Sequence, residues 1–141
     1  MVYSRIIRLS DTDAAGVIYF ASLLSICHEA YEDYLAQAGI NLKNFFRDSE
    51  TAIPIVHGEI DFFRPLFCGD RIQVNLTPIL LNEHSFEIIY QITVNDCLDK
   101  PVAKGLTRHI CINPRTRQKL AVPKSIQQAL LCESDHSQST I

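Results

Sequence analysis

Apolar side chains recur every three or four residues over one segment in the first third of the chain. Over residues 22–38 they fall on one stripe of a helix, and acidic and amide residues occupy the opposite side. This spacing is typical of an amphipathic helix whose stripe faces a hydrophobic core. Gly39 follows directly, as glycine commonly does beyond a helix end. The pattern therefore predicts one long helix over 22–38, with a first turn as early as Tyr19.

After about residue 51 the period of the hydrophobic pattern changes to two. Alternation of this kind is typical of strands with one covered face, and turn-forming residues separate the alternating segments. We also expect a short first strand over 2–9, and a closing helix over 123–131 because proline suits a first turn. The predicted long strands cover residues 53–63, 72–80, 86–94 and 102–112.

Together these elements predict an α+β fold, in which one long helix is wrapped by a curved antiparallel sheet of about five strands, with a short C-terminal helix. The tight turns between consecutive strands favour a meander-like sheet. The helix must pack on that sheet, because no other element can bury its stripe. Such a sheet leaves its edge strands exposed, so we expect dimerisation through an edge or through the uncovered face.

The composition is that of an ordinary globular domain. The chain has 141 residues, of which 47% are hydrophobic and 21% charged, and its formal net charge is -3. This balance excludes extensive disorder and gives no overall electrostatic footprint for nucleic acid. No apolar stretch approaches the roughly 20 residues of a membrane span, and the first residues lack a secretory pattern. We therefore expect a cytoplasmic protein with no membrane partner, one domain over 1–132 and a polar tail over 133–141.

The five cysteines are scattered and contain no C-x-x-C pair. Such spacing signals neither a zinc site nor a disulfide framework. We expect no metal and no organic cofactor, and reduced, mostly buried thiols at Cys27, Cys68, Cys97, Cys111 and Cys132.

The sharpest local feature is the segment SDTDAAGVIYF at 10–20, which joins the predicted first strand to the long helix. The start of a helix offers unpaired N–H groups and a partial positive charge, which can polarise a carbonyl and hold a developing oxyanion. A carboxylate beside it stays ionised, so it can attack a carbonyl or take a proton from water. The segment thus contains the groups that acyl transfer requires.

Spacing alone leaves other roles for this segment open. Aspartates before a helix commonly serve only as caps or turn formers. A D-x-D pair also occurs in divalent-metal sites and as the nucleophile of phosphotransferases. No third acidic cluster accompanies the pair, and 141 residues are few for a phosphatase of that type.

Two stretches of the sequence carry a family resemblance. The run DTDAAGVIYF at 11–20, followed by HEAYE at 28–32, is similar to the opening of hotdog-fold thioesterases of the 4-hydroxybenzoyl-CoA thioesterase type. The family pattern is roughly D-x-D-x-x-G-[VI]-x-[YW]-[FY] before a helix. The run PIVHGEIDFFRP at 54–65, with CGD at 68–70, resembles the strand and turn that follow. The resemblance spans about residues 3–125, and implies a hotdog fold and hydrolysis of an aromatic acyl-CoA, with 1,4-dihydroxy-2-naphthoyl-CoA of phylloquinone biosynthesis as the expected substrate.

The resemblance also implies roles for single residues of the motif. Asp13 matches the catalytic carboxylate of the family, and Phe20 matches the residue whose backbone N–H polarises the thioester carbonyl. Gly16 falls where the backbone turns closely past the substrate, and Tyr19 is expected to contact the substrate. Asp11 matches a position of structural role. Because family active sites lie between two subunits, the resemblance implies a homodimer, with dimers pairing into a homotetramer.

Further candidates for contact with the acyl group lie on the predicted strand over 53–63. His57 shares a strand face with Glu59 and Phe63. It can donate to a phenolic oxygen or orient a water, although a hydrogen-bonded structural histidine is an equally good interpretation. Five phenylalanines are candidates for an aryl slot, but most aromatics at such spacing belong to a core, and we expect this of at least three. They are Phe45, Phe46, Phe62, Phe63 and Phe67.

The phosphates of CoA require a basic rim. Some relatives carry paired arginines in the turn between their third and fourth strands, where this chain has Asn-Glu-His at 82–84. That mode of phosphate binding is therefore not expected here. The alternative candidates are Arg64, Lys104, Arg108, Arg115 and Arg117, although a solvated charged face is the more common role of any single one.

The leading prediction is an acyl-CoA thioesterase. One alternative is a thioesterase of the same fold acting on 4-hydroxybenzoyl-CoA, on short or fatty acyl-CoA or on acyl carrier protein. Another is a non-catalytic protein that binds acyl-CoA and uses Asp13 only as a cap. The complete D-x-D-x-x-G-V motif favours the enzyme.

Overall fold

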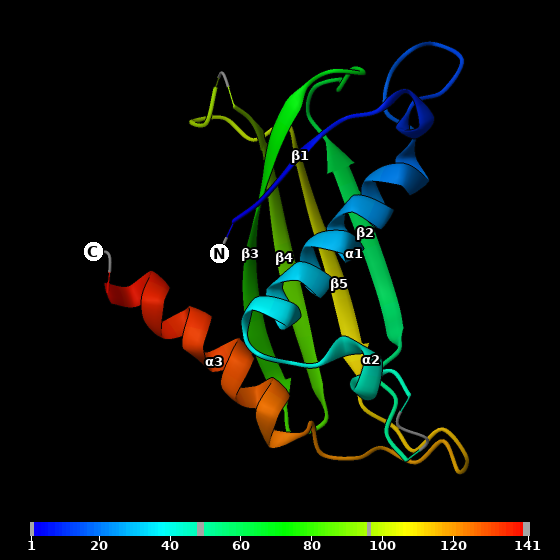
Figure 1. Cartoon of the computed structure of the whole chain (residues 1–141), viewed down its shortest axis with the longest axis vertical. Helices are drawn as coiled ribbons and strands as arrows, with labels where there is room; N and C mark the ends of the chain where they lie inside the picture. The colour runs from blue at the N-terminus through cyan, green and yellow to red at the C-terminus, as the bar shows by residue number, and fades with distance from the viewer. Residues whose placement is uncertain (1, 48–49, 96, 140–141) are drawn as a thin grey trace.

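One long helix lies on a five-stranded antiparallel sheet (Figure 1). The computed structural model describes residues 2–47, 50–95 and 97–139, with side chains as far as Leu131. The predicted α+β architecture is confirmed. In chain order the elements are β1 (Val2–Ile6), a 3₁₀ turn η1 (Leu9–Asp11), α1 (Phe20–Gln37), α2 (Leu42–Phe45), β2 (Ile55–Phe62), β3 (Arg71–Asn82), β4 (Ser85–Val94), β5 (Ala103–Ile110) and α3 (Lys124–Ser139).

α1 buries the stripe that the sequence pattern indicates. Its buried residues are Leu23, Ile26, Cys27, Ala30, Tyr31, Tyr34 and Leu35. They pack against the inward-facing residues of the sheet, among them Ile72 and Val74 of β3 and Phe86, Ile88 and Tyr90 of β4. Removing this much apolar surface from water is the main term that holds helix and sheet together.

The position of β2 corrects the expected meander. β3, β4 and β5 are neighbours as predicted, but the strand order is β1-β3-β4-β5-β2, so β2 pairs with β5 at the edge far from β3. The connection over 63–70 crosses the end of the sheet, where the Leu66 carbonyl accepts a hydrogen bond from the Ile18 N–H. It can be this short because the sheet curls around α1, which contacts both edge strands, β1 and β2.

The phenylalanines proposed for an aryl slot correct a second expectation. None of the five is buried: Phe46, Phe62, Phe63 and Phe67 are exposed, and Phe45 only partly covers the core. Tyrosines 31, 34 and 90 and aliphatic side chains fill the interior instead. Much aromatic surface therefore lies at the two ends of β2, where it is available to a ligand or to another chain.

The thiols also differ in part from expectation. Cys27 and Cys111 are buried, whereas Cys68 and Cys97 are exposed, and all four are free. The side chain of Cys132 lies outside the described residues.

The C-terminal helix is longer than predicted. α3 runs to Ser139, through most of the segment expected to be a polar tail. It packs on β3, and the Tyr34 hydroxyl of α1 donates a hydrogen bond to the Ala129 carbonyl. None of the described helices combines the length and the apolar character that crossing a membrane requires.

Candidate active site

A small hairpin over 12–18 presents Asp13 just before α1. Thr12 and Ile18 form its bridge, and the Asp13 N–H donates to the Val17 carbonyl at 2.8 Å. Gly16 has a φ of +83°, and its N–H donates to the Asp13 carbonyl at 3.0 Å. Glycine suits this position because other L-residues rarely adopt that conformation. The hairpin thus explains why the motif has glycine three residues after its second aspartate.

The carboxylate of Asp13 is exposed and only half engaged. Its Oδ1 accepts a hydrogen bond from the Ala15 N–H at 2.8 Å, which is the turn-forming role that the sequence left open. Within the described part of the chain Oδ2 has no hydrogen-bond partner. One oxygen therefore fixes the side chain while the other stays available for chemistry.

The first residues of α1 supply backbone donors close by in the chain. Tyr19 is the N-cap residue, and no side chain caps the helix there. The Tyr19 N–H donates to the Asp11 carbonyl at 2.9 Å, but the Phe20 N–H has no acceptor among the described residues. An unpaired N–H at a helix start carries partial positive charge, so it can bind a carbonyl oxygen or an oxyanion.

An aromatic cavity adjoins this helix start. It has a volume of about 490 Å³ and lies between the first turn of α1 and the segment that follows β2. The Phe20 and Phe62 rings, which both line it, contact each other with their centroids 6.1 Å apart. Of the predicted site residues, this cavity brings together Phe20, Phe63 and Arg64. Its full lining is Val17, Ile18, Phe20, Phe62, Phe63, Arg64, Pro65 and Leu66. We call it the helix-start cavity.

Asp13 itself lines none of the cavities found in the described residues. It stands on the hairpin whose far side, at Val17, forms part of the wall of the helix-start cavity. Tyr19 is exposed beside it and is not part of the lining. In one chain the helix-start cavity therefore does not include the Asp13 carboxylate.

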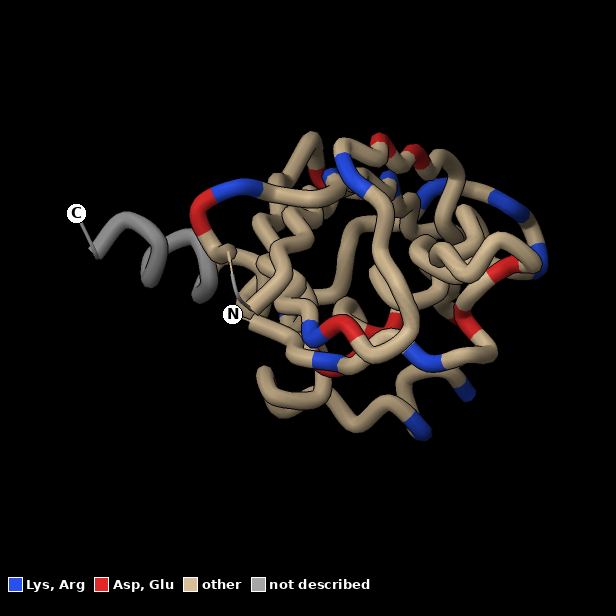
Figure 2. Tube along the Cα trace, turned by 90° about the horizontal axis from the view of Figure 1, so that it is seen from above, with Lys and Arg blue, Asp and Glu red and all other residues tan. Residues whose placement is uncertain are grey.

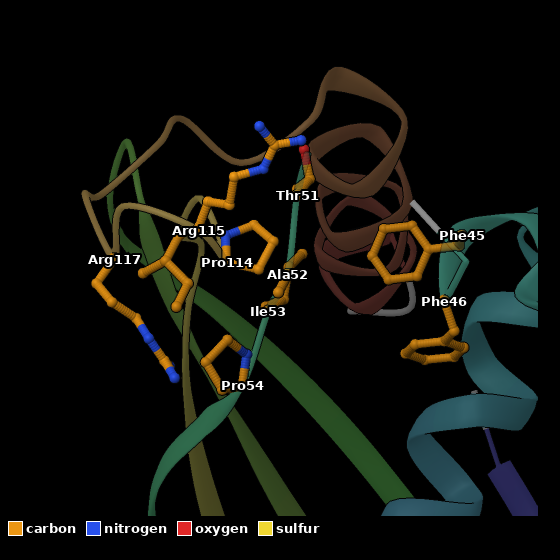
Figure 3. A pocket seen from close by; sticks show the side chains of 10 residues that line it. Phe45, Phe46, Thr51, Ala52, Ile53, Pro54, Pro114, Arg115 and Arg117 are labelled. Carbon is orange, nitrogen blue, oxygen red and sulfur yellow. The ribbon is translucent and has the colours of Figure 1, made fainter. Parts of the chain in front are cut away.

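A second cavity lies at the opposite end of β2, with a volume of about 630 Å³. Figure 3 shows Arg115 and Arg117 on one side of it and Phe45 and Phe46 on the other. Neither arginine has an ion-pair partner within the described part of the chain. Arg117 has a φ of 66°, the one positive value outside glycine among the described residues. We call it the arginine cavity.

The remaining predicted residues lie on the outer face of the sheet and border neither cavity. His57 and Glu59 are exposed because Gly58 and Ile60 take the inward-facing positions of β2. The His57 Nε2 and Glu59 Oε2 atoms lie 3.8 Å apart. Lys104 is exposed on β5. Arg108 is engaged by Glu87, with Nη2 2.7 Å and Nε 2.9 Å from Oε2. The structure therefore separates these four from the helix start, and it separates His57 and Glu59 from Phe63, which follows the end of β2 and lines the helix-start cavity.

Charges are spread around the molecule. Figure 2 shows acidic and basic residues interspersed along the trace, without one face of a single sign. This distribution agrees with the small net charge of -3 and gives no basic stripe for a nucleic acid.

Sequence reasoning missed several residues of the site. Val17, Pro65 and Leu66 line the helix-start cavity only because the connection after β2 passes under the hairpin. Arg5 of β1 forms an ion pair with Asp11, with Nη1 2.9 Å from Oδ2. The sequence feature that could have pointed to Arg5 is a charged residue within the predicted first strand. Asp11 has a structural role here, as the resemblance implies.

The fold and this site define a thioesterase of the hotdog type, and the chain belongs to the thioesterase-like superfamily, whose model matches residues 7–130. A 1,4-dihydroxy-2-naphthoyl-CoA hydrolase of Crocosphaera subtropica is 59% identical over 135 residues, which cover 96% of this chain and 98% of the relative. The protein of the same name from Rippkaea orientalis is 60% identical over 128 residues, covering 91% and 93%. The crystal structure of a 1,4-dihydroxy-2-naphthoyl-CoA thioesterase from Synechocystis superposes with a TM-score of 0.87 at 40% identity, and covers 92% of this chain and 94% of that one.

These comparisons confirm the family and the hotdog fold that the motif at 11–20 predicts. They also agree with the expectation, drawn from that resemblance, that the substrate is 1,4-dihydroxy-2-naphthoyl-CoA. The roles of single residues in catalysis and binding stay predictions.

Proposed function

We propose that this protein hydrolyses 1,4-dihydroxy-2-naphthoyl-CoA to the free naphthoic acid and CoA, with Asp13 and the Phe20 N–H as the reacting groups. The relatives that cover nearly all of this chain carry that activity in their names. The observation that carries the proposal is the Phe20 N–H, which has no acceptor among the described residues and belongs to a residue that lines an aromatic cavity, next to the hairpin that displays Asp13.

The chemistry follows from this placement. The thioester carbonyl oxygen binds the Phe20 N–H, so the negative charge that develops in the transition state meets the positive end of α1. The carboxylate of Asp13 then acts on the carbonyl carbon in one of two ways. It attacks directly and forms a mixed anhydride that water later cleaves, or it takes a proton from a water that attacks. In both routes the C–S bond breaks and CoA leaves as a thiolate, which needs little help from an acid.

The helix-start cavity suits a flat, largely apolar acyl group. Phe20, Phe62 and Phe63 offer ring faces and edges against which a naphthalene ring can stack. Gly16 leaves the hairpin without a side chain at its turn, and the space there is open, with no other heavy atom within 4 Å of where a Cβ would stand. Binding in this cavity brings the carbonyl next to the start of α1.

Basic residues at the two ends of β2 are the proposed contacts for CoA. Arg64 lines the helix-start cavity, and Arg115 and Arg117 line the arginine cavity. Guanidinium groups without carboxylate partners are available to phosphate oxygens. Arg108 is a weaker candidate because its guanidinium already forms an ion pair with Glu87.

A second copy of the chain is the proposed closure of the site. β2 pairs with β5 on one side only, and its other edge is free in the described chain. Ile55, Val56, Phe62 and Phe63 are exposed along it. An edge with this much apolar surface favours pairing with another strand. A homodimer, and a tetramer made of two dimers, would cover the open side of the helix-start cavity, and light scattering after gel filtration measures the assembly.

We also propose a cytoplasmic location. The thiols of Cys27, Cys68, Cys97 and Cys111 are free, which agrees with a reducing compartment.

A panel of thioesters tests the proposed reaction. The purified protein is incubated with 1,4-dihydroxy-2-naphthoyl-CoA, 4-hydroxybenzoyl-CoA, a short and a fatty acyl-CoA, and an acylated carrier protein, and free thiol is followed with time. We expect the highest kcat/KM for the naphthoyl ester. A higher value for another ester would select the alternative thioesterase, and binding without thiol release from any of them would select a non-catalytic acyl-CoA-binding protein.

A further inference from the structure

A largely buried ion pair connects the motif hairpin to the rest of the protein. Arg5 of β1 presents its guanidinium to Asp11 in a fork, with Nη1 2.9 Å from Oδ2 and Nη2 3.2 Å from Oδ1. The two side chains are only 15% and 13% exposed. Bidentate pairs of this kind fix orientation as well as distance.

The same guanidinium also reaches α1. Its Nε lies 3.1 Å from Oε2 of Glu29, and the Tyr3 hydroxyl donates to that oxygen at 3.0 Å. Arg5 therefore links three elements: β1, which carries it, the turn η1 through Asp11, and α1 through Glu29. The lining of the helix-start cavity includes none of these residues.

Asp11 passes this restraint on to both reacting groups. Its carboxylate accepts a further hydrogen bond from the Arg8 N–H at 2.8 Å, and its carbonyl accepts one from the Tyr19 N–H at 2.9 Å. Tyr19 immediately precedes Phe20, and Asp13 lies two residues after Asp11. Burial alone would raise the pKa of Asp11, but the hydrogen bonds from Arg5 and Arg8 and the charges of both arginines hold that pKa below its usual value. Asp11 is thus a fixed anion at the base of the hairpin.

From this geometry we infer that Arg5 is a positioning residue for thioester hydrolysis, acting through Asp11 to hold the Asp13 carboxylate and the Phe20 N–H in one mutual arrangement. The inference rests on the proposed function. Without the fork the hairpin keeps its bridge between Thr12 and Ile18 and the bridge from Val17 to Phe67, but it loses the side-chain link to β1 and α1. Small displacements of reacting groups reduce the rate of the chemical step far more than they reduce substrate binding.

The chain contains a matched control for this pair. Glu87 is 14% exposed and, like Asp11, accepts two hydrogen bonds from an arginine, here Arg108 on the outer face of the sheet. Asp11→Asn and Glu87→Gln each remove one largely buried, arginine-bound carboxylate charge. They differ in that only Asp11 is joined to the motif hairpin.

The experiment measures kcat and KM with the naphthoyl ester, per folded molecule and well below the melting temperature of every variant. We expect Arg5→Met and Asp11→Asn each to lower kcat about 10- to 100-fold while KM stays within about 2-fold, and Arg5→Lys to recover part of the loss. The double variant should fall no further than either single one, because both remove the same link. Glu87→Gln should keep the kcat of the unmodified protein.

Two results would overturn the inference: an unchanged kcat in Asp11→Asn, or an equal loss in Glu87→Gln, which would indicate a general effect of lost ion pairs. If Arg5→Met does not fold, the comparison of Asp11→Asn with Glu87→Gln decides alone. Asp13→Asn is measured in the same series. An inactive Asp13→Asn beside a fully active Asp11→Asn rejects only the positioning role, whereas a fully active Asp13→Asn rejects the proposed catalytic site.

Discussion

The two cavities at the ends of β2 differ in the chemical groups that line them. The helix-start cavity combines a backbone N–H, held by a helix, with aromatic walls and a hairpin of fixed geometry. The arginine cavity has apolar walls as well, but its polar groups are the long side chains of Arg115 and Arg117. Rigid backbone donors suit a developing oxyanion, whose position changes little. Long cationic side chains suit a phosphate, which needs charge more than exact placement.

This difference predicts that loss of a reacting group at the helix-start end of β2 lowers kcat, whereas changes at the arginine end alter only KM. The largest effect is expected for Asp13→Asn, because the amide can neither attack the carbonyl nor accept a proton. We expect kcat to fall by about 10²- to 10⁴-fold with KM little changed. Steady-state thiol release measures this, and circular dichroism checks that the variant is folded. A folded variant that keeps the original rate would contradict the role of Asp13.

The aromatic wall gives the next largest effect. Phe62→Ala removes one ring from the helix-start cavity without touching Asp13 or the Phe20 N–H. We expect a KM about 10-fold higher for the naphthoyl ester, corresponding to one lost ring contact and its buried area. A short-chain acyl-CoA is the control substrate, since it makes little use of the ring. An equal loss with both substrates would show that Phe62 supports the fold and not acyl recognition.

Neutralising the arginine cavity should have a smaller effect. The double change Arg115→Gln and Arg117→Gln is expected to raise KM about 3- to 10-fold and leave kcat unchanged, as is usual for exposed charge contacts. The dependence of KM on ionic strength should weaken in parallel, because screening acts on the contacts that the variant has lost. If KM of the variant responds to salt as before, the phosphates of CoA bind elsewhere.

A core residue that borders neither cavity sharpens the comparison, because it should change stability without changing rate. His109 of β5 is buried, and its Nε2 is hydrogen-bonded to the Thr107 hydroxyl at 2.8 Å. Its ring stacks on that of Phe86, with the ring centroids 4.7 Å apart. Burial, with a contribution from the charge of His28, lowers the pKa of His109 from 6.5 to about 4. The folded protein thus holds this imidazole neutral, while the unfolded chain binds a proton below pH 6.5.

The sign of the pH effect follows from this difference. Because the pKa of His109 is lower in the folded state, the unfolded state takes up the proton first. The contribution of His109 to the free energy of unfolding is therefore fully present above pH 6.5 and is lost as the pH falls towards 4. The loss attributable to His109 is roughly 3 kcal/mol at the acid end. Urea unfolding of the original protein and of His109→Phe at pH 7.5 and 4.5 measures it: the variant should lose less stability on acidification and keep its kcat at pH 7.5. Equal losses would show that carboxylates alone cause the acid sensitivity.

The sequence predicted the parts of the molecule that depend on neighbours in the chain. The stripe over 22–38 identified the buried face of α1, and alternation identified β3, β4 and β5. The motif at 11–20 indicated a turn at Gly16 before the helix, because few residue types other than glycine adopt the φ of +83° found there. Both local periodicity and turn chemistry report the conformation of a segment and the face that is covered.

Tertiary structure alone decided which segments meet. Alternation over 53–63 marked a strand but could not show that β2 pairs with β5, since any strand with one covered face fits either edge. It could not show that Phe62 and Phe63 stay outside the core, because an aromatic residue has the same pattern whether a core, a ligand or a partner covers it. The link from Arg5 through Asp11 to the start of α1 likewise arises only when β1 lies beside the helix. Local sequence therefore determined the conformation of the segment proposed to react, and long-range packing determined the walls and supports around it.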